Sequence, residues 1–484
     1  MSASRLRVLV ALVAVSLAVL SLMRLEHART GLDITPHLLG ETPATLYQSE
    51  QSDDLLVVVA HGFAGSRQMM EALSITLAKS GHNVVAFDFF GHGRHTGLLS
   101  PDITSLTGTT EDLVLQTLDV VAEARAVTGL NRVALLGHSM ATDVVVRAAA
   151  RLQDVDSVVA ISMYSEAVTP TQPERLLIIS GAQENRLRSV ALDVVGQVGA
   201  AEENQTQQRG AVERRAAVAP VVGHVGVLWS KTTMEEAARW IGGAGGPVFT
   251  GPWIAALLAA LFALTWPLAR SLPKAPQAPE PPTRRRAILA ATLPAPFAAL
   301  ASFIDLPMLG LSGFAALFAV FAVWGAVALA ALRWRPPPLS GPALLGGLVL
   351  VVWGLGVFGL AMDRYAAAFW PSGPRGALML ALLPAMLLFA AADRAMVQGR
   401  HSVMRTLLRL PFLATLLAAM VLNVADIGLL FTVLPVFVLF IAVYGTMARW
   451  IERQTGTLGS TIASGIILAW SIAASTPLFS AGVP

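Results

Sequence analysis

From Trp253 onward the chain is a succession of apolar runs, and this feature limits its fold more than any other. A helix needs about 20 apolar residues to cross a bilayer, where every backbone polar group must be bonded within the protein. The runs cover residues 252–270, 287–304, 308–332, 341–362, 376–393, 408–423, 427–447 and 457–476. They predict an all-α transmembrane domain of about eight helices over residues 251–484.

Another apolar run occupies residues 8–23, directly after Arg5 and Arg7. No small-residue cleavage site precedes Arg24, which favours an uncleaved signal-anchor helix over residues 1–24 rather than a removed signal peptide. Charged residues make up only 13% of the chain and hydrophobic residues 55%. Soluble proteins carry about 25% charged residues, so the composition argues against a wholly soluble protein.

The basic residues of the loops indicate how these helices would be oriented. If the N-terminus is cytoplasmic, the cytoplasmic loops hold Arg270, Lys274, Arg284, Arg285, Arg286, Arg333, Arg335, Arg394, Arg400, Arg405, Arg409, Arg449 and Arg453. Five of these lie in the Pro/Arg-rich loop 272–286 or just before it. The opposite loops hold Arg364 and Arg375 with Asp305, Asp363 and Asp426. This asymmetry follows the positive-inside rule and places residues 25–250 outside the cytoplasm.

Carboxylates are rare in the apolar runs. Asp305, Asp363, Asp393 and Asp426 all fall near predicted helix ends, so we expect them in loops or at the membrane interface. Arginine and alanine are abundant whereas lysine occurs only three times, a composition that suggests a bacterial source. We therefore expect a multi-pass protein that is located in the bacterial inner membrane.

Residues 25–250 have the mixed composition of a globular domain. Continuous apolar runs at 55–60, 83–89, 132–137, 157–162, 175–180 and 217–222 are typical of parallel strands that are buried on both faces. Helical patterns at 111–127 and 141–152 lie between them. Alternation of strands and helices predicts a mainly parallel sheet with helices on both faces.

A serine stands between the 132–137 strand and the helix that follows it, in Gly137-His138-Ser139-Met140-Ala141. A sharp strand-to-helix turn exposes such a serine, and small neighbours are needed because the backbones come close. The helix N-terminus also favours a developing negative charge. Ser139 is therefore the candidate nucleophile.

Two further loops would complete the site. His61-Gly62-Phe63 ends the 55–60 strand, so the backbone N–H of Phe63, beside that of Met140, could bind the oxyanion. His224 follows the 217–222 strand and is the candidate general base. Glu184, after the 175–180 strand, is the candidate acid that orients it, with Glu166 as the alternative. We expect supporting structural roles for His61, Gly62, Gly137 and His138.

The segment from about 50 to 240 resembles the α/β-hydrolase family. The likeness rests on HGFAGS (61–66), FDFFGHGRHTG (87–97), GHSMA (137–141), SGAQE (180–184) and GHVGVL (223–228), in this order. It covers under half of the chain, with Ala141 and Glu184 as departures from the commoner Gly and Asp. The resemblance implies the α/β hydrolase fold and serine-dependent chemistry through an acyl-enzyme. An anchor, a lipase-like domain and a helical membrane domain together also resemble the layout of glycosylphosphatidylinositol inositol-deacylases.

These observations predict a membrane-anchored serine hydrolase that cleaves an acyl ester, plausibly of a lipid. Only about a dozen residues separate Ser162 from Arg175, too few for the cap that many lipases carry. There are two alternatives. The first is an acyltransferase with the same triad, and the second is a transporter or scaffold with a regulatory hydrolase-like domain. We expect membrane lipids as partners, no nucleic acid, no cofactor and no metal, and the oligomeric state stays open.

Overall fold

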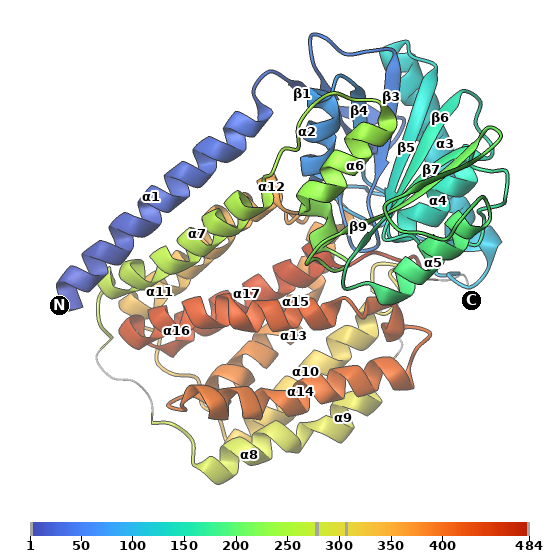
Figure 1. The fold of residues 1–484 in the computed structure, drawn as a ribbon. Helices are drawn as coiled ribbons and strands as arrows, with labels where there is room; N and C mark the ends of the chain where they lie inside the picture. Colours follow the sequence, from blue (N-terminus) through green and yellow to red (C-terminus); the bar gives the residue numbers. More distant parts are fainter. Residues whose placement is uncertain (1–2, 276–279, 305–307, 482–484) are drawn as a thin grey trace. The chain divides into compact units, whose positions relative to one another are not determined.

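The computed structural model describes residues 3–275, 280–304 and 308–481 (Figure 1). These residues form two compact units. The first, here the α/β unit, comprises Leu20–Ala256 together with the short stretch Asp363–Ala368. The second, here the helical unit, takes the remainder of the chain. Asp305 and residues 276–279 of the Pro/Arg-rich loop lie outside the described residues.

One sheet organises the α/β unit. Its nine described strands are β1 (Asp33–Leu39), β2 (Thr42–Gln48), β3 (Leu55–Ala60), β4 (Asn83–Phe87), β5 (Arg132–His138), β6 (Val155–Ile161), β7 (Arg175–Gly181), β8 (Thr206–Arg209) and β9 (Val212–Ala219). They lie in the order β1-β2-β4-β3-β5-β6-β7-β9-β8. The strands from β4 to β9 in this order pair in parallel, and β1, β2 and β8 pair antiparallel at the two edges. The predicted fold class, an α/β hydrolase sheet joined to a helical region, is confirmed.

The central strands are the ones that the sequence identifies. Every residue of β3 is buried, because helices cover both faces of the sheet. On one face α2 (Glu71–Lys79) and α6 (Lys231–Ile241) share a core with alternate residues such as Val57 and Val59. On the other face lie α3 (Glu111–Thr128) and α4 (Met140–Ala149), while α5 (Asn185–Gly196) follows β7 (Figure 1).

The strand predicted at 217–222 is displaced. It begins at Val212 and ends at Ala219, so it includes the charged sequence Glu213-Arg214-Arg215. Arg214 is fully buried, and its guanidinium donates to the carbonyl oxygens of Thr169 (3.2 Å) and Glu174 (3.0 Å) and also to that of Pro173. Burial lowers the pKa of Arg214 to about 10, which leaves it charged at neutral pH. The strand therefore tolerates a buried charge because carbonyl groups of the loop before β7 bind the guanidinium.

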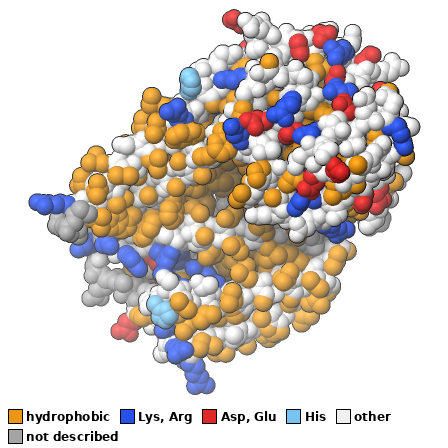
Figure 2. Space-filling model, in the orientation of Figure 1, with side chains coloured by type: hydrophobic (Ala, Val, Ile, Leu, Met, Phe, Trp, Pro, Cys, Tyr) orange, Lys and Arg blue, Asp and Glu red, His pale blue; other side chains and the backbone are white. Residues whose placement is uncertain are grey.

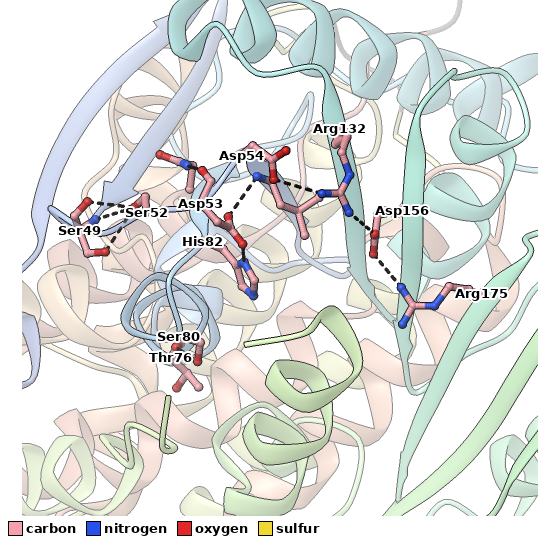
Figure 3. A network of polar contacts seen from close by, with 12 residues as sticks. Ser49, Ser52, Asp53, Asp54, Thr76, Ser80, His82, Arg132, Asp156 and Arg175 are labelled. Carbon is pink, nitrogen blue, oxygen red and sulfur yellow. Dashed lines mark hydrogen bonds and ion pairs between the residues drawn. The ribbon is translucent and has the colours of Figure 1, made fainter. Parts of the chain in front are cut away.

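Ion pairs join the amino ends of the central strands (Figure 3). Arg132, the first residue of β5, donates to Asp54 before β3 (3.1 Å) and to Asp156 on β6 (2.8 Å). Asp156 also accepts a hydrogen bond from Arg175, the first residue of β7 (2.9 Å). Ligands bind at the carboxyl ends of the strands in open α/β sheets. These ion pairs lie at the opposite end of the strands.

The helical unit contains the remaining elements. They are α7 (Gly251–Ser271), α8 (Arg284–Thr292), α9 (Pro294–Ala301), α10 (Phe314–Leu332), α11 (Gly341–Val351), a π-helical stretch (Val352–Gly359), α12 (Leu360–Tyr365), α13 (Pro374–Val397), α14 (Ser402–Leu422), α15 (Val433–Ala442), α16 (Tyr444–Thr455) and α17 (Thr457–Ser475). The helix α1 (Ala3–Arg29) and α7 and α12 each cross from one unit to the other. Hydrophobic side chains dominate the visible surface of the helical unit (Figure 2).

Eight helical stretches within the described residues are long and apolar enough to cross a membrane, α1 included. This number is compatible with a membrane protein. The prediction of one continuous helix over 287–304 is wrong, because α8 ends at Thr292 and α9 begins at Pro294. Pro294 and Pro296 have no N–H, so two of the helical hydrogen bonds cannot form there.

The loops of the helical unit, together with the adjoining helix ends, form two groups. Some residues from each of the segments 280–286, 332–337, 391–398 and 457–461 line one shared cavity. Elsewhere Asn423 donates to the carbonyl of Ser302 (2.8 Å), and Ser312 donates to the carbonyl of Phe479 (3.0 Å). The helix α8 begins in the first group, at Arg284, and α9 ends beside Ser302 of the second group. Together the two helices therefore connect the groups, despite the break between them. The first group consists of segments for which the sequence predicts the cytoplasmic side.

Asp393 does not lie in a loop, one of the two places predicted for it. It is buried within α13 and accepts two hydrogen bonds of 2.7 Å from Arg409 of α14. Both charges are thus paired in a bidentate arrangement, as burial in an apolar unit requires.

Replacing Arg214 by Met should destabilise the α/β unit. The substitution keeps much of the side-chain volume and leaves the carbonyls of Thr169, Pro173 and Glu174 without their donor. A buried unsatisfied group costs about 1–3 kcal/mol, and each kcal/mol lowers Tm by about 2–4 °C in a domain of this size. Thermal unfolding of the full-length protein should show Tm lower by several degrees. Arg209→Met, on the exposed edge strand β8, is the control and should leave Tm unchanged.

Candidate active site

Ser139 occupies a strained turn between β5 and α4. Its backbone has φ 53° and ψ −118°, a conformation that residues with a side chain rarely adopt. A Cβ atom at Gly137 would lie 2.6 Å from the carbonyl oxygen of Ala141, so only glycine fits there. Ala141 is itself fully buried, and its methyl group is accommodated where glycine is commoner. The turn therefore projects the Ser139 side chain at the carboxyl end of the central strand.

The three predicted polar side chains are brought together, with His224 between Ser139 and Glu184. Ser139 Oγ lies 2.8 Å from His224 Nε2. On the other side of the ring, His224 Nδ1 lies 2.6 Å from Glu184 Oε1. The three residues follow β5, β7 and β9, so neighbouring parallel strands deliver them to the same edge of the sheet.

Glu184 is held as a carboxylate. Its Oε2 accepts hydrogen bonds from the Ser162 hydroxyl (2.8 Å) and the backbone N–H of Gly181 (2.6 Å). Burial alone would raise the pKa of Glu184, but the hydrogen bonds from His224, Gly181 and Ser162 outweigh it and leave the pKa below its ordinary value. The alternative acid, Glu166, is exposed and accepts a hydrogen bond from Tyr164 instead.

His138 supports the loop that carries His224. Its Nε2 lies 2.9 Å from the carbonyl oxygen of His224, and the two rings lie with centroids 5.1 Å apart. Burial lowers the pKa of His138 to about 4, so the ring is neutral at physiological pH. A neutral ring that donates from Nε2 to this carbonyl fixes the backbone of His224 without adding a second positive charge.

The predicted oxyanion loop lies against the serine turn. His61 is fully buried, donates from Nδ1 to the carbonyl of Gly62 (2.8 Å) and accepts from the N–H of Phe89 at Nε2 (3.1 Å). Burial also lowers the pKa of His61, which keeps it neutral. A Cβ atom at Gly62 would lie 3.0 Å from Ser139 Cβ, so this glycine permits the close approach. Met140 is the first residue of α4, where backbone N–H groups have no partner within the helix.

Asp88, which follows β4, links the surrounding loops. It is fully buried and accepts hydrogen bonds from the backbone N–H groups of Arg67 (2.8 Å) and Arg94 (3.0 Å), and from the Arg67 side chain. The side chain of Arg94 in turn pairs with Asp363 at 2.5 Å. The stretch Asp363–Ala368 thus belongs to this unit, although the sequence predicts residues 251–484 as one membrane domain.

The same stretch contacts the end of the oxyanion loop. The backbone N–H of Ala368 donates to the hydroxyl of Ser66 at 3.0 Å. Tyr365 donates to Glu26 at 2.5 Å. These contacts attach the HGFAGS loop to a segment that is about 300 residues further along the chain, which no local sequence pattern indicates.

The rim of the site is open and apolar. The His224 side chain is 47% exposed. Val221 and Val225, which flank it along the chain, are 84% and 51% exposed, and Tyr164 is 51% exposed. Tyr164 lies close to the serine turn, because Thr142 Oγ1 accepts from the N–H of Tyr164 (3.2 Å) and donates to the carbonyl of Ser139 (2.7 Å). Among the described residues, no group of three or more His, Asp or Glu side chains is arranged to hold a metal ion.

Sequence reasoning missed Ser162 as a partner of the acid. It stands directly after β6 with φ 54°, on the strand between those that precede Ser139 and Glu184. A polar residue that ends a strand between two candidate site strands is the signal that could have identified it. Arg67, which bonds Asp88, carries no comparable signal.

Gly137→Ala should disturb the serine turn. The added methyl would meet backbone atoms of Ala141, which cannot move without shifting α4, and overpacking of this kind costs about 1–3 kcal/mol. We expect a lower Tm for the full-length variant. The control is Gly196→Ala in α5, whose Cβ would lie at an ordinary 3.6 Å from Ala201. An equal Tm for Gly137→Ala and wild type would contradict the described turn.

Comparison with known proteins agrees with this architecture. Residues 56–222 match the family model described as alpha/beta hydrolase fold. Among solved structures, the chain is similar to a protein of Thermus thermophilus (17% identity, covering 44% of this chain and 99% of that one, TM-score 0.32). It is also similar to a hormone-sensitive lipase from a metagenome library (15% identity, covering 50% of this chain and 98% of that one, TM-score 0.32). A third similar structure is a dienelactone hydrolase from Anabaena variabilis (17% identity, covering 43% of this chain and 95% of that one, TM-score 0.32). No curated protein matches by sequence. The family match and the described sheet together show that residues 56–222 lie in a domain with the α/β hydrolase fold.

Proposed function

We propose that the protein is a serine hydrolase that cleaves acyl esters through an acyl-enzyme. The observation that carries this proposal is the continuous contact from Ser139 Oγ through His224 to Glu184, at 2.8 Å and 2.6 Å. Distances of this size allow proton transfer between nucleophile and base, with the base oriented by a third group.

The hydrogen bonds determine which nitrogen of His224 carries the proton. Glu184, as a carboxylate, can only accept, so Nδ1 donates to it and Nε2 presents a lone pair to Ser139. His224 can therefore take the serine proton as a general base. The adjacent carboxylate then stabilises the imidazolium that forms.

The reaction follows from these roles. Ser139 Oγ attacks the ester carbonyl carbon while its proton passes to His224 Nε2. The backbone N–H groups of Met140 and Phe63 donate to the oxyanion of the tetrahedral intermediate. The intermediate collapses to the acyl-enzyme, and His224 protonates the leaving alcohol. Water then attacks the acyl-enzyme with His224 as base, which releases the acid and restores Ser139.

Several features support an apolar acyl substrate at a membrane. Tyr164, Val221 and Val225 present exposed apolar side chains beside the serine and the histidine, and an acyl chain would bury them. Only residues 162–174 connect β6 with β7, so no helical cap is inserted there. The helical unit would hold the enzyme in the bilayer, and the positive-inside distribution of basic residues supports a position of the hydrolase domain on the non-cytoplasmic side.

Ser139→Ala should abolish labelling by a fluorophosphonate probe and hydrolysis of p-nitrophenyl butyrate. Alanine removes the atom that both reagents require, while the fold is unchanged. The control is Ser189→Ala, an exposed serine of α5 that should label and hydrolyse like wild type. Labelling of the Ser139→Ala variant at the wild-type level would disprove the proposal. A comparison of lipid extracts from cells with wild type and with Ser139→Ala would then identify the accumulating substrate.

Glu184→Gln should lower kcat by about 10³–10⁴-fold, as loss of the orienting carboxylate does in a serine triad. The glutamine amide can donate to Nδ1, and the ring proton would then move to Nε2 and block acceptance of the serine proton. The depressed pKa of Glu184 implies that wild type keeps the carboxylate down to pH values below the ordinary carboxyl pKa of 4.5. The matched variant Glu166→Gln should keep wild-type kcat. The reverse result would reassign the acid to Glu166.

A further inference from the structure

A basic cavity of about 340 Å³ lies within the helical unit, apart from the serine site. Four arginines line it, which are Arg286, Arg333, Arg335 and Arg394. Glu280 is the one carboxylate among its described lining residues. The cavity therefore carries an excess of positive charge. Its volume falls within the range of small-molecule sites, which begins at about 300 Å³.

The arginines come from segments that are distant in sequence. Arg286 is in the first turn of α8, Arg333 and Arg335 follow α10, and Arg394 is near the end of α13. Like charges that converge on one concavity repel one another unless an anion lies between them. Their convergence thus points to a negatively charged ligand.

Arg394 is the buried member of this set. Its side chain is 4% exposed, donates to Ser464 at 3.2 Å and pairs with Glu452 at 3.3 Å. Its Nε is buried and has no hydrogen-bond partner. A buried guanidinium N–H without a partner is costly, and an oxyanion in the cavity that it lines would satisfy it.

Two helix N-termini add to the positive potential. Thr283 caps α8 by accepting from the N–H of Arg286, and Thr457 begins α17, and both threonines line the cavity. Helix N-termini attract anions through their unpaired N–H groups and the helix dipole. Thr461, one turn further along α17, supplies a hydroxyl group to the same lining.

We propose that this cavity binds the phosphate group of an anionic ligand. Arginine is suited to phosphate because its planar guanidinium donates two parallel hydrogen bonds. Trp334 and Leu332 also line the cavity, so an apolar part of the ligand would have contacts beside the phosphate. The phosphate could belong to a lipid headgroup, since the segments concerned are those predicted on the cytoplasmic side, or to a free phosphate ion.

The test compares two double variants of the full-length protein. Arg286→Gln with Arg335→Gln removes two charges from the cavity. Arg284→Gln with Arg285→Gln removes the same charge from neighbouring residues of α8 that do not line it. In one arm, native mass spectrometry measures retention of phosphatidylglycerol against phosphatidylcholine from mixed nanodiscs. In the other, the rise of Tm with inorganic phosphate is measured against chloride at equal ionic strength.

Wild type should bind phosphatidylglycerol preferentially or be stabilised by inorganic phosphate, and the arm that responds identifies the source. The cavity variant should bind about tenfold more weakly, which corresponds to 1.4 kcal/mol. The Arg284/Arg285 variant should behave like wild type. The proposal is overturned if wild type responds in neither arm, or if both double variants lose binding equally, because the charge would then act only diffusely. Serine-probe labelling plays no part in either readout, so the proposal stands or falls separately from the hydrolase activity.

Discussion

The left-handed backbone at Ser139 is the constraint on which the hydrolase site depends. A non-glycine residue in such a conformation costs about 1–3 kcal/mol, and it persists only where the surroundings fix it. Here α4 packs directly against the end of β5, at a distance that only Gly137 permits. The turn directs Ser139 away from the sheet and leaves His138 buried behind it, where its ring binds the His224 carbonyl. One backbone geometry therefore positions both the serine and, through His138, the histidine.

Burial and hydrogen bonding distinguish the histidines of the site from one another. The site holds three histidines within a short distance, and two of them, His61 and His138, have lowered pKa values because they are buried. They bind backbone groups as neutral rings. Glu184 is kept ionised by three hydrogen bonds although it is mostly buried. His224 is thus the ring that is both exposed and paired with a carboxylate.

The sequence predicted the parallel core and the site residues because both follow local patterns. Continuous apolar runs mark strands buried on both faces, and the candidate Ser, Glu and His each follow such a run within four residues. The edge strands β1, β2 and β8 escaped detection because Pro36 and Pro43 interrupt the first two and β8 is polar. The placement of Asp363–Ala368 could not be predicted, since it depends on contacts between residues far apart in the chain.

The charged residues of the apolar half have a second role beyond indicating orientation. Where a carboxylate is available, an arginine is neutralised within the helical unit, as Arg409 is by Asp393. Around the cavity the arginines outnumber the carboxylates, and one guanidinium N–H is left buried and unpaired. Burying charge in an apolar unit is costly unless it is compensated. An anion of the kind proposed above would supply this compensation at the cavity, whereas the serine site is assembled from residues of the α/β unit alone.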